Sequence, residues 1–344
     1  MTNVAISIKA SLDSISESNH IYPATFADVG HNLVGYNKQS ETASAVQVDS
    51  VGSFANRLEL ELSGLELLPE IRTRVGDRVI SIHEMPHRAY DAILRDSTLD
   101  GTPWRQSEIG NAVLCSDINN ATALYTYAPL TLLLGGWDSH GGDAGSGAKI
   151  ARSVACEIWG YDVQTTKHCT QRIDPLSITS DSEKHSVVDS ILVPDEKGKK
   201  PSELGHGDVP GSEQKGVFVK NIELSGAVSL ARLSRYHFPT DDGEVTDERD
   251  TAAREVLIQL ALVGIARVMD RLDLRSGCEL YTTNREFSLI NANGTRKSVD
   301  VTRSTDQLLA TIETAKAHGL EFATEPVTLI AGPALESLAA KGGI

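Results

Sequence analysis

VDSVGSFANRLELELSG, residues 48–64, is the stretch that most restricts how this chain can fold. Phe54, Leu58 and Leu62 recur at the spacing that places side chains on one face of an α-helix. Valines and a Ser/Asp turn precede this pattern. The stretch therefore predicts an amphipathic helix whose apolar face is buried in the core.

The opposite face of this predicted helix is polar and lies close to its start. Ser53, Asn56 and Arg57 share that face. Ser50 or Ser53 can cap the helix, because a serine hydroxyl accepts hydrogen bonds from free N–H groups of the first turn. Free N–H groups, the positive end of the helix dipole and a forked guanidinium suit an anion such as phosphate. A polar face that is simply solvated is the alternative interpretation.

A glycine-rich loop dominates a second informative stretch, residues 128–160. After the loop, the spacing of Ile150, Val154 and Ile158 predicts a helix that begins near Ala148. Glycines before a helix let the backbone approach an anion closely. The loop region also supplies hydrogen-bond donors and an aromatic stacking surface for an RNA backbone: Trp137, Ser139, His140, Lys149 and Arg152. A flexible loop before a capped helix is the alternative.

Residues 83–87 read His-Glu-Met-Pro-His and match the zinc motif H-E-x-x-H. That motif requires two histidines on one helical turn, with the glutamate as general base. Pro86 lies inside the turn, where a missing N–H and a steric clash cost about 3 kcal/mol. His87 is therefore not expected one turn above His83. A zinc-dependent hydrolase that uses His83 and His87 is kept as the alternative function.

Composition limits the class of protein. The chain has 344 residues, 40% of them hydrophobic, enough for one large or two modest domains. Its net charge of −15 argues against nucleic acid, whose phosphates are neutralised by Lys and Arg. Local charge can nevertheless differ from global charge. The four cysteines form no C-x-x-C pair, and neither a membrane span nor a signal peptide is recognisable, so the sequence predicts a cytoplasmic protein.

The rest of the chain alternates between strand-like and helix-like stretches. Residues 4–12 alternate apolar and polar side chains, as a half-buried strand does, whereas residues 13–47 are expected to be mostly loop. Residues 247–272 predict the clearest helix, which belongs to the core. The tail predicts strands at 286–290 and 298–301 around an Asn293-Gly294 turn, and a helix at 305–318 that ends at Gly319.

Five short motifs occur in order along the chain. They are S-x-x-S-x-x-N-R at 50–57, W-D-S-x-G-G followed by A-K-x-A-R at 137–152, R-x-D-P at 172–175, KPSELGHGDVPG at 200–211 and LRSGCEL at 274–280. Together they resemble the backbone subunit of the type I-G (formerly I-U) CRISPR surveillance complex, a member of the RAMP superfamily. The 200–211 segment is the most specific match. The resemblance covers most of residues 20–280.

This resemblance implies an α+β fold: a ferredoxin-like, RRM-type palm with helical finger insertions and an extended β-hairpin thumb. Residues 1–176 would form the first part of the palm, 177–228 the thumb region, and 229–344 the rest of the palm with C-terminal helices and strands. The implied function is a non-catalytic subunit that binds the guide (CRISPR) RNA, oligomerises along it and supports pairing with target DNA.

The resemblance also implies partners and contact residues. The partners are the guide RNA, the target DNA strand, identical neighbouring subunits, an RNA-processing cap subunit and a large subunit that recognises the target's flanking motif. Neither a cofactor nor a metal is implied. Ser234, Tyr236 and His237 stand where the family has Arg, Leu and Arg, which lowers the local positive charge. The RNA-contacting candidates are Ser50, Ser53, Asn56, Arg57, Trp137, Ser139, His140, Lys149, Arg152, Arg172, His206, Arg232 and Arg235.

Overall fold

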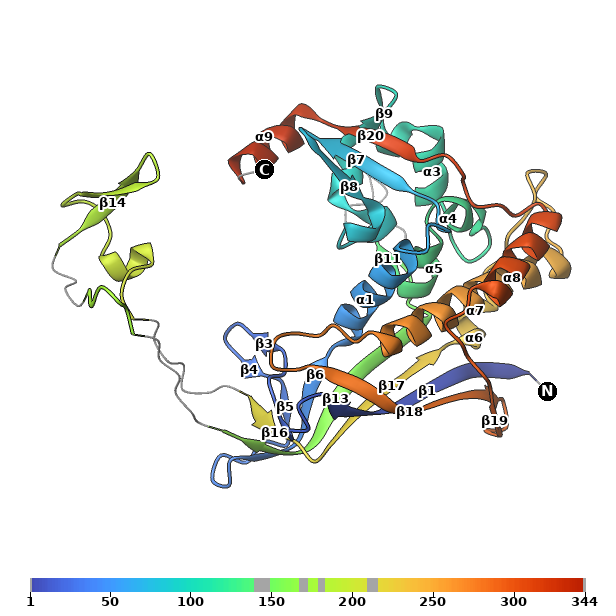
Figure 1. Ribbon diagram of the computed structural model, residues 1–344. Helices are drawn as coiled ribbons and strands as arrows, with labels where there is room; N and C mark the ends of the chain where they lie inside the picture. The colour runs from blue at the N-terminus through green and yellow to red at the C-terminus, as the bar shows by residue number, and fades with distance from the viewer. Residues whose placement is uncertain (1, 139–148, 167–172, 179–182, 209–215, 343–344) are drawn as a thin grey trace.

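The computed structural model describes residues 2–138, 149–166, 173–178, 183–208 and 216–342 (Figure 1). Helices and strands are mixed throughout, so the predicted α+β class is confirmed. Four long strands form the centre of the main sheet in the order β18-β1-β17-β13, and each is antiparallel to its neighbours. They are β1 (Asn3–Ser14), β13 (Val154–Thr165), β17 (Asn221–Val228) and β18 (Leu280–Asn291).

Two long helices cover one face of this sheet (Figure 1). α1 (Val51–Ser63) lies in the chain between β1 and β13, and α7 (Asp247–Asp270) lies between β17 and β18. A Cβ atom at Gly264 of α7 would lie 3.0 Å from the side chain of Leu62. Glycine therefore allows the two helices to approach closely, and both belong to one continuous hydrophobic core.

Short strands extend the main sheet at its edges. β6 (Thr42–Asp49) pairs with β13, and β5 (Leu33–Val34) pairs with β6. The other members of this sheet are β2 (His20–Ile21), β16 (Val217–Phe218) and β19 (Arg296–Ser298). β3 (Thr25–Phe26) and β4 (Gly30–His31) form a separate small hairpin.

A second, five-stranded sheet has the order β10-β9-β20-β7-β8. It joins residues 71–103 to the end of the chain, because β20 (Val327–Ala331) runs parallel to β7 (Ile71–Val75). The other strands are β8 (Arg78–Ser81), β9 (Ser97–Leu99) and β10 (Thr102–Pro103). Figure 1 shows this sheet beyond α1, on the side away from the main sheet.

Short helices connect and flank the two sheets. They are α2 (Ala92–Arg95), α3 (Glu108–Leu114), α4 (Thr122–Tyr127), α5 (Pro129–Leu134), α6 (Leu230–Leu233), α8 (Asp306–Ala317) and α9 (Pro333–Lys341). Four 3₁₀ turns are η1 (Ile82–Glu84), η2 (Arg88–Tyr90), η3 (Trp104–Gln106) and η4 (Pro201–Leu204). α5 leads in the chain to Gly136 and Trp137, and Tyr90 of η2 lies against Gly136.

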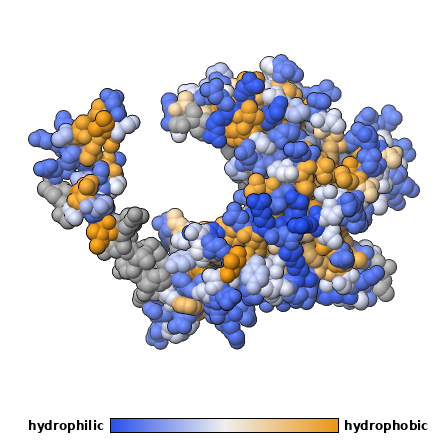
Figure 2. Space-filling view, in the orientation of Figure 1, coloured by the Kyte–Doolittle hydropathy of each residue, from blue (hydrophilic) through white to orange (hydrophobic). Residues whose placement is uncertain are grey.

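A β-hairpin stands apart from the body in Figure 1. It consists of β14 (His185–Val188) and β15 (Ile191–Pro194), which pair in antiparallel register. Figure 2 shows hydrophobic side chains gathered on this unit, where Val187, Val188 and Ile191 are all more than half exposed. The division at residues 176 and 228 stays a prediction; β16 and β17, which fall before the second boundary, pair within the main sheet.

Most predicted elements are present. The 48–64 helix is α1, the 247–272 helix is α7, the 305–318 helix is α8, and the 4–12 strand is part of β1. Ser50 caps α1, since its hydroxyl accepts a hydrogen bond from the N–H of Ser53 at 3.2 Å. The Asn293-Gly294 turn joins β18 to β19.

Two expectations about secondary structure were wrong. The helix expected to begin near Ala148 is instead β12 (Lys149–Ile150) followed by β13. Val154, Cys156 and Ile158 alternate with more exposed residues along β13. A spacing of four residues fits a strand as well as a helix, because four is a multiple of the strand period. The second error lies in the tail, where the strand expected at 298–301 is instead β19 at Arg296–Ser298. Residues 13–47 are mostly loop, as expected, although β6 begins among them at Thr42.

Candidate nucleic-acid interface

The N-terminal turn of α1 places polar groups at the protein surface. Ser50 is the N-cap, Ser53 is part-exposed, and Asn56 is exposed one turn later. Phe54, Leu58 and Leu62 are buried on the other side, as the sequence pattern predicts. The first-turn N–H groups and the positive end of the helix dipole thus face the same region as these polar side chains.

Arg57 already has partners within the protein. Its Nε donates to Oδ2 of Asp49 at 3.2 Å, and its Nη2 donates to the carbonyl oxygen of Leu274 at 3.2 Å. About a quarter of the side chain is exposed. These bonds hold the guanidinium in one orientation beside α1, while part of it stays open to a ligand.

The base of the glycine-rich loop is a short two-stranded pair. β11 (Gly136–Trp137) pairs with β12, so that Trp137 lies opposite Lys149. The Lys149 ammonium lies 5.8 Å from the centroid of the Trp137 ring, within the range of a cation–π contact. Trp137 is 61% exposed, and Lys149 is exposed as well. An open aromatic face and a positive charge therefore stand side by side. Ser139 and His140 lie outside the described residues.

Arg152 joins the loop base to the start of α1. Its Nη1 donates to the carbonyl oxygen of Val51, the first residue of the helix, and its Nε donates to that of Leu134, both at 3.0 Å. Burial lowers the pKa of Arg152, the nearby Arg88 lowers it further, and Glu59 opposes the change. Although Arg152 was predicted to contact a ligand, the structure shows a side chain that holds two surface segments together.

The remaining candidates are distributed unevenly. Arg232 of α6 donates from Nη1 to the carbonyl oxygen of Arg152 at 3.1 Å, so it adjoins the same cluster. Arg235 is exposed just beyond α6. His206 follows η4, which comes after the β14–β15 hairpin in the chain. Arg172 lies outside the described residues.

Sequence reasoning missed a buried ion pair beneath this surface. Nε and Nη2 of Arg88 donate to the Glu59 carboxylate at 2.6 and 2.7 Å, and both side chains are buried. Nη1 of Arg88 also reaches the carbonyl oxygen of Gly135 at 3.3 Å. Burial raises the pKa of Glu59, and the bonds from Arg88 oppose that shift. A single acidic residue on the apolar face of the 48–64 pattern was the only sequence signal for this pair.

A second missed pair fixes the entry to the loop. Nη1 and Nη2 of Arg105 donate to the two carboxylate oxygens of Asp138 at 2.8 and 2.7 Å, a bidentate pair. Asp138 is almost completely buried and directly follows Trp137. Nothing in the spacing of these residues, which are 33 positions apart, indicated that they meet.

Gly136 lies close to the aromatic ring of Tyr90. A Cβ atom at this position would come within 2.6 Å of that ring and 3.0 Å of the Thr131 side chain. Only glycine allows β11 to lie this close to η2 and α5. The second glycine of the loop base is therefore needed for packing rather than for direct contact with an anion.

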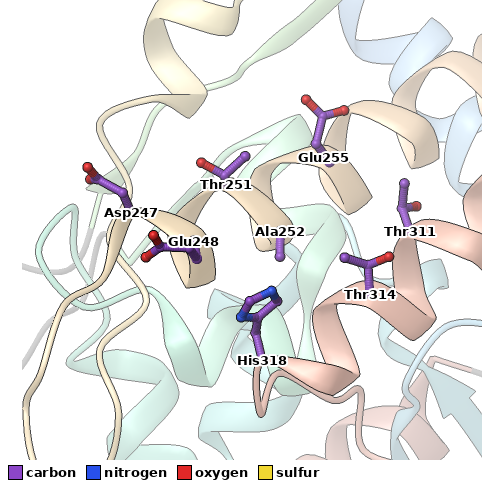
Figure 3. Close-up of a pocket in the computed structure, with 8 residues that line it drawn as sticks. All are labelled: Asp247, Glu248, Thr251, Ala252, Glu255, Thr311, Thr314 and His318. Atoms are coloured by element: carbon purple, nitrogen blue, oxygen red, sulfur yellow. The ribbon is translucent and has the colours of Figure 1, made fainter.

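The pocket in Figure 3 lies away from this cluster, between the first turns of α7 and the end of α8. It has a volume of about 460 Å³ and is lined by three carboxylates and one imidazole, those of Asp247, Glu248, Glu255 and His318. Burial raises the pKa of Glu255. Carboxylates repel phosphate, so this pocket does not extend the candidate interface.

The geometry does not suit the zinc alternative. His83 lies in η1, whose last residue is Glu84, and Met85 is extended. His87 instead precedes η2 and is exposed, so the two histidines do not share a helical turn. Pro86 interrupts the turn, as the sequence predicted. Among the described residues, no three His, Cys, Asp or Glu side chains are grouped to hold a metal ion.

Comparison with known families gives a match in the first half of the chain. Residues 6–165 match the family described as CRISPR-associated protein GSU0053. The matched segment makes up a little less than half of the chain. It runs from β1 to the end of β13, and so includes α1, the β11–β12 pair and Arg152. The match supports the resemblance to the type I-G backbone subunit. A comparison with curated proteins gives no match. In the parts of the chain that the structure describes, every helix is too short or too polar to cross a bilayer.

Proposed function

We propose that this protein is a non-catalytic guide-RNA-binding backbone subunit of a type I-G surveillance complex. The proposal rests on one cluster, which consists of the start of α1, the Trp137–Lys149 pair and Arg152. The Arg152 side chain connects the loop base to the helix start through its hydrogen bond to Val51. Such a surface combines helix N–H groups, a cation and an aromatic face. These groups grip ribose, phosphate and bases without reading their sequence.

The connectivity of the main sheet supports the expected palm. Its elements follow the chain order β1-α1-β13-β17-α7-β18, and the strands lie in the spatial order β18-β1-β17-β13. This is the β-α-β-β-α-β pattern of a ferredoxin-like unit, the architecture of RRM-type domains. We infer that α2 to α5 and the second sheet are the finger insertions.

The separate hairpin supports the expected thumb. Its exposed valines and its exposed isoleucine are unfavourable in water, which favours a role in contacting another molecule. We propose that it reaches over the guide RNA, and that identical subunits line up along that RNA. The target DNA strand, the processing cap subunit and the large target-recognising subunit would be the other partners of the assembly.

Net charge also fits a local rather than a global RNA contact. The chain carries −15 overall, so binding depends on the few cations that the fold brings to one surface. The bidentate pairing with Arg105 neutralises the carboxylate charge of Asp138 beside Trp137. We infer that this pair prevents repulsion of phosphate at the loop base.

Fluorescence anisotropy with labelled single-stranded RNA tests the proposal. Lys149→Ala should weaken binding and lower the slope of log K against log salt by about 0.7, the value for one phosphate of a single strand. Trp137→Leu should weaken binding by about 1–3 kcal/mol, the range for one stacked base. Lys316→Ala on α8, beside the acidic pocket, is the matched control and should change neither quantity.

Two outcomes would refute the proposed function. One is affinity for RNA that is equal in the wild type, Lys149→Ala and Trp137→Leu. The other is a loss of RNA affinity in Arg57→Ala that differs between RNA sequences. Phosphate positioning is independent of sequence, so the loss should be the same for all of them. Expression beside a repeat array supplies a second test, because the protein should then co-purify with a discrete small RNA.

A further inference from the structure

A second aromatic surface lies on the main sheet, at its β5–β6–β13 edge. There Asn32, Gln47 and Trp159 stand in one row across neighbouring strands. Trp159 is the register partner of Gln47, and the backbone N–H of Gln47 donates to the carbonyl oxygen of Asn32 at 3.0 Å. The Asn32 amide also donates to the side-chain oxygen of Gln47 at 3.0 Å. The row is therefore held rigidly.

Trp159 points away from the core. Its neighbours Ile158 and Gly160 are buried, whereas Trp159 is part-exposed, and successive side chains of a strand point to opposite faces. The sheet has a bulge at this position, since Ile158 pairs with Asp49 but Trp159 pairs with Gln47. Bulges re-aim neighbouring side chains.

A hollow of about 550 Å³ opens beside this ring. Two aromatic rings, those of Tyr36 and Trp159, share its walls with an imidazole and an amide, those of His31 and Asn32. Three aliphatic side chains complete the lining: Val29, Leu33 and Val34. Val29 and Val34 are 66% and 51% exposed. Apolar side chains left open in this way indicate that something covers them.

We propose that this hollow, named here the Tyr36–Trp159 pocket, binds one unpaired base of a single-stranded nucleic acid. Aromatic faces stack on any base, and imidazole and amide groups hydrogen-bond to base edges. Nδ1 of His31 already pairs with the carbonyl oxygen of Ala24 at 3.1 Å, which holds the ring in place. The inference rests on the proposed function and adds a second contact to it.

A base, rather than a phosphate, is the group that fits. The Gln47 amide donates to the carboxylate of Glu157 at 3.3 Å, so a negative charge stands next to the pocket. That charge disfavours phosphate but leaves stacking unaffected. Loss of the pocket should therefore weaken binding without altering its salt dependence, unlike loss of Lys149.

Trp159 itself reports on the pocket. The chain has three tryptophans, and Trp104 is buried, so a Trp137→Phe background leaves Trp159 as the accessible fluorophore. Its emission should be quenched by a single-stranded oligonucleotide, and the quench should be lost in Tyr36→Leu. Tyr281→Leu on β18, where Tyr281 is about as exposed as Tyr36, is the matched control and should keep the quench.

RNA and DNA oligonucleotides, added singly and then together, identify the source of the base. A quench by RNA alone assigns a guide base, and a quench that requires DNA assigns a base of the target. Equal quenching by an oligonucleotide of abasic residues would overturn the proposal. So would a quench that rises with protein concentration alone, since a protein surface would then cover the pocket.

Anisotropy in the same samples separates the two proposals. Binding without any quench of Trp159, by RNA alone and by RNA together with DNA, overturns the pocket and leaves the proposed function intact. Equal affinity of the wild type and Tyr36→Leu for these oligonucleotides has the same meaning. Absence of RNA binding by the wild type overturns both. The expected result is binding with quench, and a roughly tenfold weaker affinity in Tyr36→Leu at every salt concentration, equivalent to about 1.4 kcal/mol.

Discussion

Nη1 of Arg152 lies 3.0 Å from the carbonyl oxygen of Val51, and this one hydrogen bond connects the two surface segments of the candidate interface. Val51 begins α1, while Arg152 lies between β12 and β13. The residues are 101 positions apart in the chain. The relative placement of the helix start and the loop base therefore depends on a side chain that also lies beside the buried Glu59.

We expect Arg152→Met to reduce both stability and RNA affinity. Methionine keeps most of the apolar stem but removes the donors to Leu134 and Val51, and hydrogen bonds from a charged group contribute about 1.5–3 kcal/mol each. Urea unfolding followed by circular dichroism measures the first effect, and anisotropy measures the second. Arg235→Met, at an exposed arginine, should stay within about 0.5 kcal/mol of the wild-type stability.

The Glu59–Arg88 pair predicts a non-additive double variant. Arg88→Met leaves the Glu59 carboxylate buried without its partner, which should lower the free energy of unfolding by about 3–5 kcal/mol. Removing both charges in Glu59→Leu/Arg88→Met should cost less than Arg88→Met alone, because no uncompensated charge remains. Urea unfolding of the wild type, Glu59→Leu, Arg88→Met and the double variant measures this coupling, and additive losses would contradict it.

The hairpin predicts a separation between folding and assembly. Deletion of residues 181–211 removes β14 and β15 but none of the buried strands of the main sheet, so thermal unfolding of the body should be nearly unchanged. Ordered assembly on a guide-length RNA should be lost. Electron microscopy of particle length is the measurement, and particles of normal length after the deletion would refute the role as thumb.

His83 predicts a specific dependence of stability on pH. Burial lowers the pKa of His83 below its ordinary value of 6.5, so the folded protein binds fewer protons there than the unfolded chain. Its contribution to stability is therefore complete above about pH 6.5 and is lost as the pH falls toward the folded-state pKa.

Comparison with glutamine variants isolates this effect. The stability of the wild type relative to His83→Gln should fall between pH 7 and pH 5, as measured by urea unfolding. His87→Gln replaces an exposed histidine and should show a nearly constant difference from the wild type. If the stability difference between the wild type and His83→Gln does not change with pH, burial does not shift the pKa of His83.

Much of the fold was predictable because it depends on local pattern. The apolar spacing of Phe54, Leu58 and Leu62 determines which face of α1 is buried, and a serine at residue 50 determines where the helix begins. A strand read as a helix after residue 148 marks the limit of this reasoning. A spacing of four residues fits both the helix period and the strand period. Only the pairing of β13 with β6 and β17 decides between them.

By itself, the sequence determined the mixed class, the two long helices, the failure of the zinc motif at Pro86 and, through five motifs, the resemblance to a CRISPR-associated family. These follow from periodicity, capping and the fixed geometry of proline, all of which act over a few residues. Tertiary structure alone decided that Arg88 meets Glu59, that Arg105 meets Asp138, and that Trp159 and Tyr36 line one pocket. Such contacts join residues far apart in the chain, and they form only when a common core brings their segments together.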